Sequence, residues 1–167
     1  MKWSKLKSLI ESRICKSLQK RVHIYSTAYG NCTCGHAWLT LDKKIIANFC
    51  TRAFWNRAIG NWYFKDNRWK SDNPIPKHVR FEQNRNYGFA FYGEESRQNI
   101  YTSCWEYIHK LSIEEALNSN DVLIQALAVI DYRVGKRRLL NLERKILHPL
   151  VRKLLDARIE SELKEIM

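Results

Sequence analysis

Apolar side chains near the start of the chain recur at helical spacing. Trp3, Leu6, Ile10 and Ile14 fall on one side of a helical wheel, while lysines occupy other positions of the same segment. A single apolar stripe is what a helix needs in order to dock on a sheet, so the pattern predicts an amphipathic helix over roughly residues 3–19. A basic amphipathic helix can also lie on a membrane surface, and this alternative stays open.

The pattern then changes from helical spacing to alternation. The segment 22–29 is rich in β-branched and aromatic residues, and residues 37–51 alternate on both sides of a turn at Asp42-Lys43-Lys44. These features predict a strand followed by an antiparallel hairpin. Two further short strands are expected at 77–83 and 87–92.

Helical spacing returns in the second half of the chain. Ser112 and Glu115 have the spacing of a capping box, and Asn120 or Asp121 can cap a helix over 121–133. That helix is apolar on most sides, which predicts burial, and it is expected to end at Gly135. The expected helices cover 96–111, 112–117, 121–133, 136–146 and the segment from Pro149 onward.

The order of these elements predicts an α+β fold, because strands come first and helices follow. We expect an N-terminal helix, an antiparallel sheet of four to five strands and a C-terminal helical half. The chain has 167 residues with few glycines and prolines, which favours a single domain over residues 1–167.

Charge is unevenly distributed along the chain. The net charge is +12; residues 1–83 carry 10 Lys and 6 Arg against 5 acids, or +11, which leaves +1 for residues 84–167. Such asymmetry favours a face for polyanions, acidic proteins or membrane head groups. Charge alone predicts encounter with such partners, not a specific one.

The five cysteines form no regular disulfide framework, and the N-terminus has no secretory signal, so a reducing cytoplasm is expected. A hairpin turn at Lys43 would place His36 opposite Cys50. Cys32 and Cys34 could then complete a tetrahedral zinc site. The spacing is not a common zinc spacing, so small free cysteines beside a turn are the favoured interpretation, with no metal and no cofactor.

Aromatic and basic residues interleave in the stretch 54–70, where the alternation of strands is lost. Trp55, Arg57, Trp62, Arg68 and Trp69 could stack on bases, anchor a partner protein, or fold back onto the sheet. A second basic segment, Lys136, Arg137 and Arg138, follows the buried helix at once. Asp131 is expected to pair with a nearby arginine at this corner.

Three segments resemble an uncharacterised family of small bacterial proteins. They are Lys2-Trp-Ser-Lys-Leu-Lys7, Ala37-Trp-Leu-Thr-Leu-Asp42 and Ile124-Gln-Ala-Leu-Ala-Val-Ile-Asp-Tyr-Arg-Val-Gly-Lys-Arg-Arg-Leu139, of which the last is the most specific. The resemblance implies a bacterial, cytoplasmic, single-domain protein. It implies no activity and no catalytic residue.

Two functional hypotheses remain. The first is a non-enzymatic protein that binds another protein, in an immunity or antitoxin-like role, through residues 54–70 and the Lys136–Arg138 corner. The second is a basic nucleic-acid-binding protein without sequence specificity, for which the N-terminal half supplies the charge. No recognised catalytic motif occurs in the sequence, so an enzyme ranks third.

Overall fold

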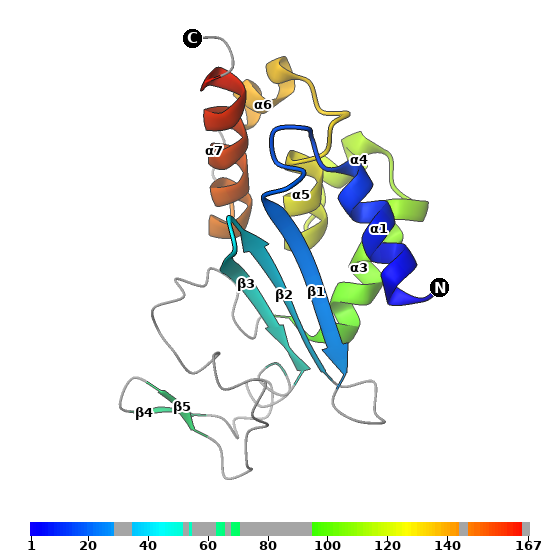
Figure 1. Ribbon diagram of the computed structural model, residues 1–167, viewed down its shortest axis with the longest axis vertical. Helices are drawn as coiled ribbons and strands as arrows, with labels where there is room; N and C mark the ends of the chain where they lie inside the picture. The colour runs from blue at the N-terminus through cyan, green and yellow to red at the C-terminus, as the bar shows by residue number, and fades with distance from the viewer. Residues whose placement is uncertain are drawn as a thin grey trace. The chain divides into compact units, whose positions relative to one another are not determined.

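The computed structural model describes residues 1–28, 35–51, 54, 63–65, 68–70, 95–143 and 147–164 (Figure 1). Contacts divide the chain into two compact units, one of residues 1–23 with 101–167 and one of residues 24–100. The single-domain prediction is not tested by this division. The elements are α1 Trp3–Arg13, β1 Val22–Ala28, β2 Gly35–Leu41, β3 Lys44–Cys50, β4 Tyr63–Lys65, β5 Arg68–Lys70, α3 Arg97–His109, α4 Ile113–Leu117, α5 Val122–Val129, α6 Lys136–Glu143 and α7 Pro149–Lys164.

The predicted α+β class is confirmed, with an N-terminal helix, an antiparallel sheet and C-terminal helices. The sheet has three described strands in the order β1-β2-β3, fewer than the four to five expected. The strands predicted at 77–83 and 87–92 lie outside the described residues. Strands β4 and β5 form a separate antiparallel pair, within the stretch that was predicted to be irregular.

A two-residue turn joins β2 to β3. Asp42 and Lys43 both have positive φ, 51° and 66°, which suits the twist of a tight hairpin. His36 pairs with Cys50, as the sequence predicted, and the register shifts by one residue between Leu39 and Thr40. The simple alternation did not indicate this irregularity of the pairing.

The first unit is built from helices around an apolar core. Helix α5 contacts both α4 and α7, and α6 contacts α7. Leu127 and Ile130 are almost completely buried, as predicted for the apolar helix. The side chains that fill this core also include Leu6, Ile10, Cys104, Leu123, Leu150, Leu154 and Leu155. Among the described helices, none is long and apolar enough to cross a membrane.

The helices in the second half of the chain begin close to the positions predicted from the sequence. Ser112 and Glu115 form the predicted capping box of α4, and Asp121, not Asn120, caps α5 through the backbone N–H groups of Leu123 and Ile124. Pro149 is the first residue of α7. The helix ends differ more: α1 stops at Arg13 instead of residue 19, and α5 stops at Val129 instead of residue 133.

Candidate interaction surface

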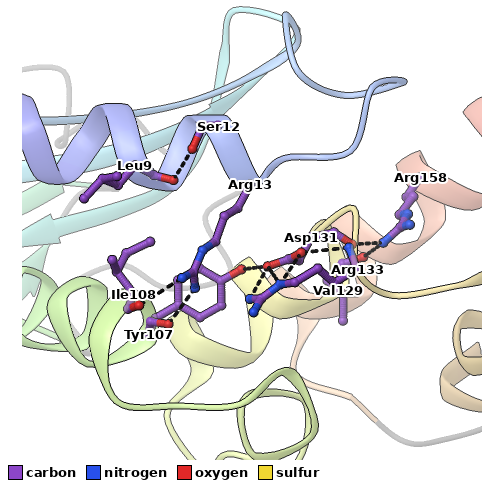
Figure 2. Close-up of polar contacts among 9 residues, drawn as sticks. All are labelled: Leu9, Ser12, Arg13, Tyr107, Ile108, Val129, Asp131, Arg133 and Arg158. Atoms are coloured by element: carbon purple, nitrogen blue, oxygen red, sulfur yellow. Dashed lines mark hydrogen bonds and ion pairs between the residues drawn. The ribbon is translucent and has the colours of Figure 1, made fainter.

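The chain between α5 and α6 is organised around the buried carboxylate of Asp131. Its oxygens accept hydrogen bonds from the Tyr107 hydroxyl and from Arg133, whose backbone N lies 2.9 Å and Nη2 2.6 Å away (Figure 2). This confirms the predicted pairing of Asp131 with a neighbouring arginine. Burial alone would raise the pKa of the Asp131 carboxyl, but the hydrogen bonds from Arg133 and Tyr107 outweigh it and the pKa is lowered.

Arg158 of α7 holds the same turn through its backbone. Its guanidinium donates to the carbonyl oxygens of Val129 at 2.8 Å, Asp131 at 2.9 Å and Val134 at 2.6 Å. These carbonyls lie at or beyond the end of α5, where a buried fork of N–H donors supplies hydrogen-bond partners. The Nε of Arg158 also pairs with Glu162 at 2.7 Å.

The end of α1 fixes this turn from another side. The backbone N of Tyr132 donates to the carbonyl of Arg13 at 2.9 Å, and that of Cys15 donates to the carbonyl of Ile130 at 2.8 Å. The Arg13 guanidinium in turn donates to the carbonyls of Tyr107 and Ile108, both at 2.9 Å (Figure 2). The polar residues of the Val-Ile-Asp-Tyr-Arg segment therefore set the position at which α6 begins.

Helix α6 presents three different sets of side chains. Leu139 and Leu142 are buried against the unit, whereas Leu140 is 51% exposed. At about 100° per residue, Lys136 and Leu140 share one flank, and Arg137 lies next to Leu140 on its solvent side. Arg138 is turned about a further 100° away and pairs with Glu114 at 3.1 Å.

Lys136 and Arg137 have no ion-pair partner among the described residues, whereas Arg138 pairs with Glu114. The first turn of α6 contains no acidic residue, so Lys136 and Arg137 face the positive end of the helix dipole. Cations at this end destabilise a helix by about 0.3–1 kcal/mol each. Helix stability therefore does not explain why these residues stand there.

An apolar pocket lies between α6 and α7, beside these cations. Leu139, Leu140, Ile159, Lys136 and Glu162 line it, and its volume is about 60 Å³. Glu162 is held by Arg158, as described above. We define the α6 surface as Lys136, Arg137 and Leu140 together with this pocket.

The structure describes the other five predicted contact residues only in part. Trp55, Arg57 and Trp62 lie outside the described residues. Arg68 and Trp69 belong to β5, where only the backbone is described. Of the eight predicted residues, the structure therefore describes the side chains of three, Lys136, Arg137 and Arg138. Arg138 differs from the other two because it has an ion-pair partner.

The possible metal ligands are placed only in part. His36 and Cys50 are buried and opposite one another on β2 and β3, whereas Cys32 and Cys34 lie outside the described residues. No group of three or more His, Cys, Asp or Glu side chains that could hold a metal ion occurs in the described ranges. The absence of zinc stays a prediction.

Sequence reasoning missed Leu140, the pocket, and the role of Arg158. Nothing in the sequence singles out Leu140, because its exposure depends on how α6 packs on α7. Arg158 did carry a signal, because it falls on the apolar stripe of the last helix together with Leu154 and Leu155. A cation on such a stripe usually has a buried acceptor.

The fold and this surface define a small α+β protein with a basic, partly apolar helix exposed beside a pocket. The chain belongs to the SF0329 protein family, whose family model matches residues 2–159. Searches of curated proteins and of solved structures returned no significant match.

Proposed function

We propose that this protein acts by binding another protein, and that the α6 surface is its contact surface. The observation that carries the proposal is the exposure of Leu140 beside Lys136 and Arg137, next to an apolar pocket. Protein interfaces commonly combine an apolar core with a polar rim, and arginine is enriched in them. The proposal includes no catalytic step, cofactor or metal.

In this proposal the apolar side chains and the cationic side chains contribute to binding in different ways. Burial of the exposed half of Leu140 in a complex contributes about 1 kcal/mol, and filling the pocket contributes more. Lys136 and Arg137 attract an acidic partner and select its orientation, which mainly raises the rate of association. An acidic partner also relieves the unfavourable interaction of these cations with the helix dipole.

An immunity or antitoxin-like role is the finer form of this proposal. In such a role the chain binds a toxin and blocks it. If the partner is a toxin encoded next to this gene, expression of that neighbour alone should stop growth, and co-expression of this chain should restore it. The Arg137→Gln variant should restore growth less well than the unchanged chain.

Binding of nucleic acid is the second candidate, and Tyr132 favours it. Tyr132 is 61% exposed and lies shortly before the basic start of α6, so its ring could stack on an unpaired base while the cations hold phosphates. The exposed Leu140 and the apolar pocket favour the protein partner instead, because a charged phosphate backbone has no apolar group to place against them.

A matched pair of variants tests the proposed function. Arg137→Gln and Arg138→Gln remove the same charge from neighbouring positions of α6, but only Arg138 already has a partner, Glu114. The full-length chain is used to capture partners from the native host, and the captured protein is then purified and titrated. We expect Arg137→Gln to weaken binding on the order of tenfold and Arg138→Gln to change it much less.

Two results would contradict the proposal. One is equal affinity of the purified partner for both variants and the unchanged chain, which would place the contact elsewhere. The other is capture of nucleic acid alone, which would favour the second candidate.

A further inference from the structure

We propose that the α6 surface recognises an acidic peptide segment that carries one aliphatic anchor side chain, and that the anchor occupies the pocket between α6 and α7. This inference rests on the proposed function, because it names the kind of segment that the same surface would bind. It adds two requirements, the size of the anchor and the charge around it.

The pocket fixes the chemistry of the anchor. Its apolar lining comes from Leu139, Leu140 and Ile159, so a polar group placed there would lose its hydrogen bonds with water. Glu162 does not offer a free carboxylate to the pocket, because the side chain is only 17% exposed and pairs with Arg158 at 2.7 Å. An apolar side chain therefore fits this pocket best.

The volume fixes the size of the anchor. At least ~10–15 Å³ of such space is needed to hold one water, so about 60 Å³ admits an apolar group of several heavy atoms. The side chains of Leu, Ile and Met each have four heavy atoms beyond Cα. A Trp side chain has about ten and is too large unless α6 and α7 move apart.

The positive charges beside the pocket indicate which residues flank the anchor in the bound peptide. Lys136 lines the pocket, Arg137 lies on the next position of the helix, and neither has an ion-pair partner among the described residues. Carboxylates on either side of the anchor can pair with both. The net charge of +12 argues against a second copy of this chain as the occupant, because two copies repel each other.

The test uses random 12-residue peptides displayed on phage and selected on the purified full chain. We expect the selected peptides to share several Asp or Glu residues around a single Leu, Ile or Met. In a synthetic peptide of that sequence, replacing the anchor with Ala or with Trp should weaken binding on the order of tenfold, since the pocket is then empty or overfilled.

Variants of the chain test the pocket and the charges separately. Ile159→Phe fills the pocket and Leu140→Ser removes one wall from a half-exposed position, and each should weaken binding of the synthetic peptide on the order of tenfold. The Lys136→Gln/Arg137→Gln pair should weaken it at least as much. Lys153→Gln removes one charge from an exposed position of α7 outside the pocket and should have little effect. Circular dichroism checks that each variant is folded, and Leu140→Ser serves alone if Ile159→Phe does not fold.

The outcomes separate this inference from the proposed function. Peptides without acidic residues, peptides without an aliphatic anchor, or no enrichment at all would overturn the inference. If the charge variants lose the natural partner but both pocket variants keep it, the α6 surface still binds protein and only the anchor is wrong. If the natural partner is indifferent to every variant, both proposals fail.

Discussion

At the residue scale, the buried carboxylate of Asp131 links the turn before α6 to Tyr107 and Arg133. It has no exposure to solvent and accepts hydrogen bonds from Tyr107 and from Arg133. A hydrogen bond to a charged group contributes about 1.5–3 kcal/mol. The most recognisable segment of the sequence is therefore explained by its contribution to the fold, and the proposed contact surface lies on its exposed neighbours.

Asp131→Asn should lower the free energy of unfolding by about 2 kcal/mol, because the amide is uncharged and has one acceptor oxygen instead of two. Urea unfolding measured at neutral pH checks this. Glu106→Gln is the matched control: Glu106 pairs with Lys110 at 3.0 Å at an exposed site, and it should change stability by less than about 0.5 kcal/mol. Equal effects of the two substitutions would contradict this account.

The effect of Asp131 should depend on pH in one direction only. The pKa of this carboxyl is lowered from its ordinary value of 3.8, so the charged form stabilises the folded state above that pH and the contribution is lost as pH falls below it. The stability difference between the unchanged chain and Asp131→Asn should be constant from about pH 5 to 7 and shrink toward pH 3. A difference that grows on acidification would refute the assignment.

Two glycines provide a comparison of opposite environments. A Cβ on Gly35 would lie 2.1 Å from the carbonyl oxygen of Thr27, whereas a Cβ on Gly135 would meet nothing within 4 Å. Gly35→Ala should therefore destabilise its unit by about 3 kcal/mol, since a backbone atom must move. Gly135→Ala should lower stability by less than about 1 kcal/mol, because the only loss is that Ala is a poorer residue than Gly at the start of a helix. Denaturant unfolding followed by circular dichroism distinguishes the two.

At the element scale, the sequence predicted which segments form helices but not where two of them end. Both α1 and α5 stop early because Ile14 and Asp131 form an isolated antiparallel bridge. The backbone of residues 13–15 pairs with that of residues 130–132, far away in the chain. Local patterns carry no information about such pairing, so hydrophobic periodicity extended both helices too far.

The same limit applies to the candidate site. The basic segment at the start of α6 was visible in the sequence as Lys136, Arg137 and Arg138. The different surroundings of Arg138, the exposure of Leu140 and the adjoining pocket follow from packing of α6 on α7 and of Glu114 near α6. A helical wheel orders the side chains of one helix, but it does not show which neighbour each side chain meets.

An acidic residue at the start of α6 should stabilise the fold and weaken binding of the partner. Gly135→Asp supplies an acidic cap to a helix whose first turn has no acidic residue, so the free energy of unfolding should rise by about 0.5 kcal/mol. The same carboxylate should weaken binding of an acidic partner, because it competes for Lys136 and Arg137. Gly135→Ser caps without charge and serves as the control in thermal unfolding and binding titrations. Stronger partner binding by Gly135→Asp would contradict the proposal.

At the scale of the whole molecule, the net charge of +12 predicts a background of binding to any polyanion. A single-stranded DNA of mixed sequence should bind weakly and without sequence preference. Its affinity should fall at least about tenfold between 50 and 200 mM salt, because binding releases counterions. Fluorescence anisotropy at several salt concentrations measures this. Tight, sequence-selective binding at physiological salt would make nucleic acid the primary partner.

Binding of a protein at the α6 surface should be distinguishable from this unspecific binding of polyanions. Arg137→Gln removes one of many cations, so its effect on DNA binding should be about twofold or less. Its effect on a protein partner should be much larger, since the partner meets Arg137 at a defined position next to Leu140. Comparable losses for DNA and protein would mean that Arg137 acts only through total charge.

Crosslinking from position 140 tests the central claim most directly. A photoreactive phenylalanine analogue replaces Leu140 in the full chain, and a second version carries it at the exposed Lys153 of α7. We predict that irradiation in the native host joins a protein partner to position 140 and not to position 153, and that Lys136→Gln/Arg137→Gln reduces the yield. Equal crosslinking from both positions, or none from position 140, would contradict the claim that the α6 surface binds a protein.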